Sequence, residues 1–141
     1  MAIEANVTLV EGMEFKGTAS SGHTLTLDAN HQYGGRNSGF RAMELVLIGL
    51  AGCTGMDVIS ILRKKKQGVV GFEVNVKGER AEEHPMVYKK IDVEYVIKGR
   101  DISEEAVARS ISLSWDKYCS VGAMLKKTAD MNYTYKIIEI R

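Results

Sequence analysis

The residues best suited to covalent chemistry are the only two cysteines of the 141-residue chain, Cys53 and Cys119. A cysteine reacts as its thiolate, and an unperturbed thiol is only about 3% ionised at pH 7. Burial lowers that fraction further. Asp57, four positions after Cys53, would oppose ionisation if charged. A nucleophilic Cys53 therefore needs a cation from another part of the chain or from another copy of it.

Two arginines are the main candidates for that cation. Arg36 lies in the stretch 29–40 (ANHQYGGRNSGF), which holds three glycines and has no helical or strand periodicity, and Arg41 follows it directly. Loops this long inside a compact domain are usually functional. Glu44 could hold such an arginine by a charge-assisted hydrogen bond. Lys126 is a more distant candidate.

Each cysteine also has a plainer interpretation. Free cysteine is usually a small buried hydrophobe, and both sulfurs could be core residues. Gly49, Gly52 and Gly55 surround Cys53, however, and glycine in a helix costs up to about 1 kcal/mol relative to alanine. They indicate either close approach of another backbone or space for a substrate beside the sulfur. If the segment that carries Cys119 packs on that of Cys53, Cys119 could resolve an oxidised Cys53 as a disulfide.

Cys53 lies in the middle of a long predicted helix, from about Ala42 to Gln67. The helix is uncharged from Leu45 to Met56, and a helix that is apolar nearly all round must be enclosed on all sides. At ~1.5 Å per residue it is about 39 Å long, more than a domain of this size covers by itself. The sequence therefore predicts a homodimer.

The same helix constrains where Glu44 can act. Glu44 and Cys53 are nine positions apart, which at about 100° per residue places them on opposite faces of a regular helix. An arginine held by Glu44 is then expected to meet Cys53 across a dimer interface, unless the helix bends near Gly52.

The remaining pattern predicts an α+β fold in a single domain over residues 1–141, with antiparallel sheets around the long central helix. Alternating residues predict strands before and after that helix. A second helical region begins at an N-cap serine, continues to about Thr128 in one or two segments, and turns either Trp115 or Ser114 inward. The predicted strands are Ile3–Val10, Phe15–Ala19, Thr24–Leu27, Phe72–Ala81 paired antiparallel with Val87–Lys98, and Met131–Ile140, and the N-cap is Ser103.

Composition argues against several classes of function. The net charge of +1 gives no case for nucleic acid or an anionic membrane as a partner, and the run Arg63–Lys66 is more simply a solvated helix end than a phosphate patch. The uncharged run Leu45–Met56 is shorter than a membrane span, and the N-terminus does not resemble a signal peptide, so we expect a cytoplasmic protein. There is no Cys-x-x-Cys and the three histidines are scattered, so we expect no metal and no other cofactor.

Two segments stand out beside the element order. The central helix begins Met43-Glu44-Leu45-Val46-Leu47 and continues through Leu50-Ala51-Gly52-Cys53-Thr54-Gly55-Met56-Asp57-Val58, and the second cysteine lies in Lys117-Tyr118-Cys119-Ser120-Val121. Together with the element order, these segments resemble the OsmC/Ohr family of osmotically induced and organic hydroperoxide resistance proteins. The resemblance covers nearly the whole chain. It implies an α+β homodimer with intertwined subunits and a thiol peroxidase without metal or flavin. It matches Cys53 to the peroxidatic cysteine, Cys119 to the resolving one and Glu44 to the glutamate that orients an arginine, here Arg36 or Arg41.

The chain departs from the family pattern at three points. Many members carry a glutamate where this chain has Met43, many have a proline where it has Ser120, and their arginine comes from an N-terminal region that here holds none within residues 1–35. The departures indicate a less characterised, OsmC-like branch of the family.

The sequence therefore leaves two alternative functions. In the first, Cys53 reduces organic hydroperoxides to alcohols through a sulfenic acid and a Cys53–Cys119 disulfide that an external dithiol reduces. Apolar walls from Leu47, Leu50, Met56 and Met124 would favour alkyl hydroperoxides. In the second, the protein is a non-catalytic dimeric module that binds a small apolar ligand, and both cysteines are structural.

Overall fold

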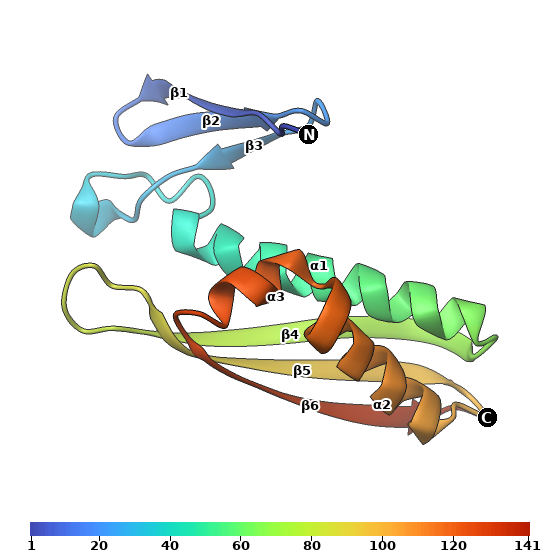
Figure 1. Cartoon of the computed structure of the whole chain (residues 1–141). Helices are drawn as coiled ribbons and strands as arrows, with labels where there is room; N and C mark the ends of the chain where they lie inside the picture. The colour runs from blue at the N-terminus through green and yellow to red at the C-terminus, as the bar shows by residue number, and fades with distance from the viewer. The chain divides into compact units, whose positions relative to one another are not determined.

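The computed structural model describes all 141 residues, which form two compact units, Met1–Val46 and Leu47–Arg141. The predicted order of strands and helices is confirmed (Figure 1). The elements are β1 (Ala5–Glu11), β2 (Glu14–Ala19), β3 (Thr24–Leu27), α1 (Ala42–Lys64), β4 (Gly68–Arg80), β5 (Tyr88–Arg100), α2 (Glu104–Leu113), α3 (Ser120–Leu125) and β6 (Asp130–Glu139).

The N-terminal unit is built on an antiparallel sheet of order β1-β2-β3. Gly12 makes the first turn with a φ of 54°, a conformation that glycine adopts without strain. After β3, a short 3₁₀ turn over His31–Tyr33 leads back toward the sheet, where Phe40 exchanges backbone hydrogen bonds with Thr26 and Asp28. The loop between β3 and α1 is therefore anchored at both ends within this unit.

The C-terminal unit contains a sheet of order β4-β5-β6. β4 and β5 form the predicted antiparallel pair. β6 pairs with β5 in parallel, so this second sheet is mixed and not wholly antiparallel. The physical reason is the connection: α2 and α3 lie between β5 and β6 in the chain, and such a crossover returns the chain in the same direction.

The helices of the C-terminal unit cover one face of this sheet (Figure 1). α1 contributes a buried stripe at four-residue spacing, Leu50, Thr54, Val58 and Leu62, which is the spacing of one helix face. α2 begins at the predicted N-cap, where the Ser103 hydroxyl accepts the Ala106 N–H at 3.2 Å. The buried hydrophobic side chains of α2 and of the central strand β5 complete the core: Tyr88, Ile91, Val93, Tyr95, Val96, Ile97, Ala106, Val107 and Ile111.

The opposite side of α1 is open in the single chain. Ile48 is 50% exposed and Met56 is 73% exposed, although the sequence predicts a helix enclosed on all sides. By length and hydropathy α1 could also cross a bilayer, but the core helix of a soluble protein meets the same criteria. The uncovered stripe is a surface on which a further partner can pack.

Candidate active site

The structure brings the two cysteines together in the C-terminal unit, and both are reduced. Cys53 is half-buried in the middle of α1, whereas Cys119 is 6% exposed. Cys119 directly precedes α3, and its sulfur accepts the backbone N–H of Gly122 at 3.3 Å. The Cys53 side chain lies within hydrogen-bonding reach of the Cys119 thiol. The two helical regions that the sequence predicts therefore hold their sulfurs as neighbours.

The environment of Cys119 favours its neutral thiol. Burial raises the pKa of Cys119 to about 11, and the Gly122 N–H only partly offsets this. The hydrogen bond and negative charge of Cys53 raise the pKa of Cys119 as well, and so does the carboxylate of Asp57. At neutral pH Cys119 keeps its proton, so it is the weaker nucleophile until its surroundings change.

The glycines near the sulfurs have different surroundings. A Cβ on Gly55 would contact Val74 of β4 at 3.4 Å, so Gly55 allows α1 to lie close to the sheet. A Cβ on Gly122 would lie 3.3 Å from the Cys119 sulfur. A Cβ added to Gly49 or to Gly52 would meet no atom within 4 Å beyond the backbone of α1, so both glycines belong to the open side of the helix. No other backbone approaches these two positions in the single chain, whereas the open space beside them agrees with the second expected reason, space for a substrate.

A chain of buried hydroxyl groups runs beside the cysteines. Ser114 donates to Asp57 Oδ2 at 2.8 Å, and its Oγ lies 2.7 Å from Thr54 Oγ1. Thr54 Oγ1 lies 2.6 Å from Tyr95 Oη, which accepts the Trp115 Nε1–H at 2.7 Å. Because each hydroxyl has one proton and Ser114 gives its own to Asp57, Thr54 donates to Ser114 and Tyr95 donates to Thr54.

Sequence reasoning missed this network. The sequence draws attention to Asp57 because of its spacing from Cys53. Thr54, in contrast, lies in a segment predicted as an apolar helix, and Tyr95 lies in one predicted as an alternating strand. Of the two inward candidates on the second helical region, Ser114 is fully buried and Trp115 is only partly so. A buried hydroxyl on an otherwise apolar face is the signal that could have indicated a polar partner across the core.

Ser114 opens a single wide helical turn. Residues Ser114–Tyr118 form a π-helical turn between α2 and α3, closed by a hydrogen bond from the Cys119 N–H to the Ser114 carbonyl at 2.8 Å. Such turns are rare and occur frequently at functional sites. Cys119 itself has extended backbone angles, φ −76° and ψ 101°. The second helical region is thus divided into two segments at the cysteine.

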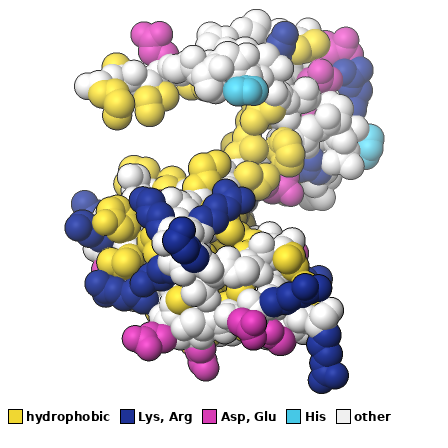
Figure 2. All heavy atoms as spheres, turned by 90° about the vertical axis from the view of Figure 1, so that its right-hand side faces the viewer, with side chains coloured by type: hydrophobic (Ala, Val, Ile, Leu, Met, Phe, Trp, Pro, Cys, Tyr) yellow, Lys and Arg dark blue, Asp and Glu magenta, His cyan; other side chains and the backbone are white.

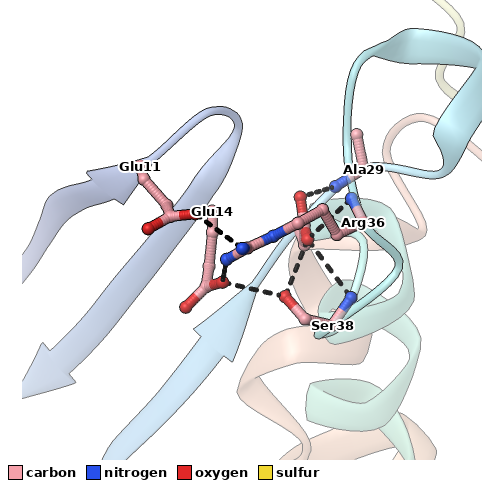
Figure 3. A network of polar contacts seen from close by, with 6 residues as sticks. Glu11, Glu14, Ala29, Arg36 and Ser38 are labelled. Carbon is pink, nitrogen blue, oxygen red and sulfur yellow. Dashed lines mark hydrogen bonds and ion pairs between the residues drawn. The ribbon is translucent and has the colours of Figure 1, made fainter.

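Arg36 makes its contacts inside the N-terminal unit (Figure 3). Its guanidinium donates to Glu11 at 2.5 Å and to Glu14 at 2.6 Å, the two carboxylates that flank the β1–β2 turn. The hydrogen bond to Glu14 and the charge of Glu11 raise the pKa of Arg36 above its usual value. Arg36 is therefore fully charged and bridges the loop to the hairpin.

Asp28 organises the same loop through hydrogen bonds to its backbone. Its carboxylate accepts the backbone N–H groups of Ala29, Arg36 and Ser38, at 2.7, 3.1 and 3.2 Å, and the Ser38 hydroxyl at 2.7 Å (Figure 3). The Ser38 hydroxyl, assisted by these backbone donors, holds the pKa of Asp28 well below its usual range. A carboxylate that accepts four hydrogen bonds fixes the course of the loop that presents Arg36.

Arg41 and Glu44 interact at the start of α1. Glu44 Oε1 accepts the backbone N–H of Arg41 at 2.7 Å, which satisfies an otherwise free donor at the helix start. The Arg41 guanidinium donates to the carbonyl of Gly39 at 3.0 Å. Glu44 thus contacts Arg41 through the backbone. Arg36, Arg41 and Glu44 all belong to the N-terminal unit, and the two cysteines to the C-terminal unit.

The other basic residues have partners or solvent around them. Lys126 donates to the Trp115 carbonyl and lies 5.1 Å from the centre of the Trp115 ring. The run Arg63–Lys66 is exposed where α1 ends, and Lys and Arg side chains gather on that face of the molecule (Figure 2). Cations at a helix C-terminus complement the helix dipole. No group of three or more His, Cys, Asp or Glu side chains is placed to hold a metal ion.

Comparison with known proteins gives the relatives of this chain. The family of OsmC-like proteins matches residues 35–134. Protein YhfA of Escherichia coli (strain K12) is 40% identical over 139 residues, which cover 96% of this chain and 98% of YhfA. A crystal structure of a hypothetical protein from Aquifex aeolicus VF5 superposes with a TM-score of 0.88 at 31% identity, covering 100% of this chain and 99% of that one.

A more distant likeness extends to a named hydroperoxide resistance protein. The organic hydroperoxide resistance protein OhrB of Bacillus subtilis has the same fold, with a TM-score of 0.63 at 16% identity over 96% of this chain and 98% of that one. The OsmC-like family includes thiol peroxidases, and its members are typically dimeric. In this fold α1 is the core helix of a soluble protein. The family match and the likeness to YhfA together show that the chain belongs to the OsmC-like family.

Proposed function

We propose that the protein is a thiol-dependent peroxidase that reduces organic hydroperoxides to alcohols. The observation that carries the proposal is the pair of neighbouring reduced cysteines with unequal surroundings: a half-buried Cys53 and a buried, protonated Cys119. A peroxidase of this type needs one accessible sulfur that attacks and a second that reacts afterwards. Membership of a family that includes thiol peroxidases supports this assignment.

The reaction begins at Cys53. Its thiolate attacks the terminal oxygen of the hydroperoxide, the O–O bond breaks, and the leaving alkoxide takes a proton to become the alcohol. Cys53 becomes a sulfenic acid. The Cys119 thiol then attacks the Cys53 sulfur, an S–S bond forms, the S–OH bond breaks, and water leaves. An external dithiol reduces the disulfide and returns both thiols.

The unequal burial supports this division of roles. Cys119, with its pKa raised to about 11, keeps its proton while Cys53 waits for substrate. Oxidation of Cys53 to a neutral sulfenic acid removes the negative charge that raises the pKa of Cys119. The resolving thiol therefore ionises more readily only after the first step has occurred.

Substrate selection and assembly are further parts of the proposal. Met56 is 73% exposed and Met124 is 65% exposed, and with Leu47 and Leu50 they would form apolar walls that favour alkyl hydroperoxides. The two units act as one OsmC-like domain in a cytoplasmic homodimer, and the open side of α1 becomes part of its interface. Arg36 or Arg41, with Glu44, supplies the cation that Cys53 needs.

A second candidate function has one observation in its favour. The N-terminal unit contains an almost wholly apolar cavity of about 390 Å³. Val7, Leu25, Leu27 and Leu45 supply its apolar walls, and the imidazole of His23 lies among its lining. A non-catalytic dimeric module would use such a cavity for a small apolar ligand, with both cysteines in structural roles.

Mass spectrometry of the intact protein distinguishes the two functions. After one equivalent of cumene hydroperoxide, a peroxidase loses two hydrogen atoms as the Cys53–Cys119 disulfide forms, and Cys53→Ser abolishes the change. Cys119→Ser, in contrast, gains one oxygen atom at Cys53, which dimedone traps. An unchanged mass of the wild-type protein would contradict the peroxidase and leave the binding module.

A further inference from the structure

We propose that Ser114 is the positioning residue that holds the resolving Cys119 against Cys53: its backbone bonds to Cys119, and its side chain bonds to α1, the helix that carries Cys53. The proposal rests on the peroxidase function proposed above and assigns a role to the buried hydroxyl network. Ser114 does not touch the reacting atoms. It acts through Cys119, and its effect is expected on the second step of the cycle alone.

The first bond runs from Ser114 toward Cys119. The Ser114 carbonyl accepts the Cys119 N–H at 2.8 Å across the π-helical turn. This bond spans one residue more than an α-helical bond, so Cys119 does not continue the rotation of α2. In a regular helix the added residue would rotate the following side chain by about 100°. The wide turn therefore decides the direction in which the sulfur leaves the backbone.

The second set of bonds runs from Ser114 toward Cys53. The Ser114 hydroxyl bonds to Thr54, the neighbour of Cys53 in the chain, and to Asp57, one turn further along α1. One buried side chain thus bonds α1 directly after the attacking cysteine and again four residues beyond it. Through its carbonyl the same residue holds the resolving cysteine. No other residue in the structure makes both connections.

The network extends to the sheet and fixes the turn at a second point. Trp115, next to Ser114 in the π-helical turn, donates to Tyr95 of β5, and Tyr95 donates onward to Thr54. Burial raises the pKa of Tyr95, so its hydroxyl remains a donor. Each hydroxyl group in this network both donates and accepts a hydrogen bond, and the hydroxyl protons all point along the network toward Asp57. Removing one member leaves its buried partners unsatisfied, which is costly.

Such positioning matters because disulfide geometry is narrow. The two Cβ atoms must approach within about 3.5–4.5 Å with a restricted torsion about the S–S bond. A sulfenic acid that waits too long for its partner is oxidised further to sulfinic acid by a second hydroperoxide. A rigid turn that keeps Cys119 in place shortens that interval.

The chain offers a matched control for testing Ser114. Ser110 is also fully buried, four residues earlier on α2, but its hydroxyl bonds only to the Ala106 carbonyl of its own helix at 2.7 Å. We expect Ser114→Ala to slow disulfide formation by about tenfold or more, because small misplacements of reacting groups have large kinetic effects. Formation of the Cys53 sulfenic acid should stay within about twofold of wild type, and Ser110→Ala should alter neither rate.

Two readouts separate positioning from general loss of structure. Stopped-flow mixing with limiting cumene hydroperoxide measures the two steps separately, and excess hydroperoxide should convert more Cys53 to sulfinic acid in Ser114→Ala than in wild type. Thr54→Val, which removes one of the two bonds to α1 and keeps the other, should slow disulfide formation by an intermediate factor. Equal slowing of both steps in Ser114→Ala, or equal effects of the Ser110 and Ser114 variants, would overturn the proposal.

A peroxide-independent oxidant keeps the two proposals distinct. Diamide can drive the Cys53–Cys119 disulfide even if the protein has no peroxidase activity, because it oxidises thiol pairs directly. Failure of wild-type Cys53 to react with cumene hydroperoxide would refute the peroxidase. Diamide closing the disulfide as fast in Ser114→Ala as in wild type and Ser110→Ala would refute the positioning role.

Discussion

The two units of the chain obtain their order in different ways. In the C-terminal unit the central strand β5 and the helices α1 and α2 bury large side chains, among them Tyr95, Leu62 and Ile111. In the N-terminal unit no hydrophobic side chain is fully buried, and every residue of β1 is exposed. Its loop is instead held by polar bonds around Asp28 and Arg36. The C-terminal unit has a hydrophobic core, whereas the N-terminal unit has an exposed sheet and a loop that hydrogen bonds hold in place.

This difference shows how the proposed chemistry is divided. The sulfur chemistry lies in the unit that has its own core, so the relation between Cys53 and Cys119 is set by packing inside one chain. The candidate arginines lie in the unit whose apolar side chains, such as Leu9 and Leu25, remain exposed. Burial of those side chains needs another surface. We therefore expect the disulfide step to be insensitive to assembly and the activation of Cys53 to depend on it.

The largest expected effects come from the sulfurs. Cys53→Ser should lower hydroperoxide reduction by on the order of 10³-fold or more, because it removes the nucleophile. Cys119→Ser should allow one turnover of sulfenic acid formation and then stop, since no disulfide can form. A coupled assay with a dithiol reductant measures both. A Cys119→Ser variant that turns over as fast as wild type would show that the C-terminal unit does not use its sulfur pair.

Stability provides a direct test of the comparison between units. Leu62→Ala, at a fully buried position of α1, should lower the free energy of unfolding by about 2–5 kcal/mol. Leu9→Ala, at a position of β1 that is 54% exposed, should cost less than about 1 kcal/mol in the monomer. Urea unfolding over a range of protein concentrations measures both. If the homodimer covers β1, the cost of Leu9→Ala grows with concentration while that of Leu62→Ala does not. An equal, concentration-independent cost would contradict the contrast.

The arginines can be ranked by substitution. If Arg36 activates Cys53, Arg36→Ala should reduce the rate of sulfenic acid formation by about tenfold or more, and Arg41→Ala should have the smaller effect. Loss of the ion pairs to Glu11 and Glu14 should by itself change stability little, because the Arg36 side chain is exposed and solvent screens such pairs. Single-turnover kinetics with Arg36→Lys as the charge-conserving control measures the first effect. The reverse ranking would assign the role to Arg41.

The two units should respond to pH at opposite ends of the scale. The folded pKa of Asp28 is below its unfolded value of about 4, so its stabilising contribution is complete above that pH and is lost as the solution becomes more acid. The folded pKa of Cys119 is raised to about 11, so its contribution is lost as pH rises from about 9 toward 11. Hydrogen exchange at the Arg36 and Ser38 amides, compared with unfolding of β5, measures each. Asp28→Asn should abolish the acid effect alone.

The smallest expected effect concerns Asp57. Asp57→Asn keeps an oxygen that can accept the Ser114 hydroxyl but removes the negative charge, so it should lower the pKa of Cys119, by much less than burial raises it. Titration of the thiol with a slow alkylating reagent, in a Cys53→Ser background for both proteins, measures the shift. A raised pKa would mean that the hydrogen bond, and not the charge, dominates at this position.

Local pattern was sufficient for most of the fold. Alternation in segments such as Thr24–Leu27 depends on neighbours within one strand, and the N-cap at Ser103 depends on one turn of helix. The direction of β6 was beyond such reasoning. Alternating residues indicate a strand with two different faces, but the same alternation fits a parallel or an antiparallel neighbour. The crossover through α2 and α3 sets the direction of β6 relative to β5, and this crossover is a property of the whole C-terminal unit.

The candidate site was predictable only in part. Cys53 and Cys119 are identified by their chemistry, and the long helix accounts for the place of Cys53. The Tyr95–Thr54–Ser114 chain of hydrogen bonds joins three segments that are far apart in sequence, and each hydroxyl by itself fits an ordinary helix or strand. The sign of a residue's charge also does not identify the group with which it forms an ion pair. Arg36 is by its position in the sequence a candidate cation for Cys53, but in the single chain its guanidinium is bound to Glu11 and Glu14. Contacts of this kind depend on tertiary structure.

The parallel docking of β6 also affects how the protein is made. β5 is the middle strand of its sheet, and along Lys90–Gly99 its partner on one side is β6, which follows α2 and α3 in the chain and is therefore synthesised well after β5. Until β6 has been synthesised, this edge of β5 has no permanent neighbour, and open strand edges invite pairing with other chains. The hairpins of the N-terminal sheet can form earlier, from local contacts. Nascent chains in which β6 has not yet been synthesised should therefore be the species that chaperones retain.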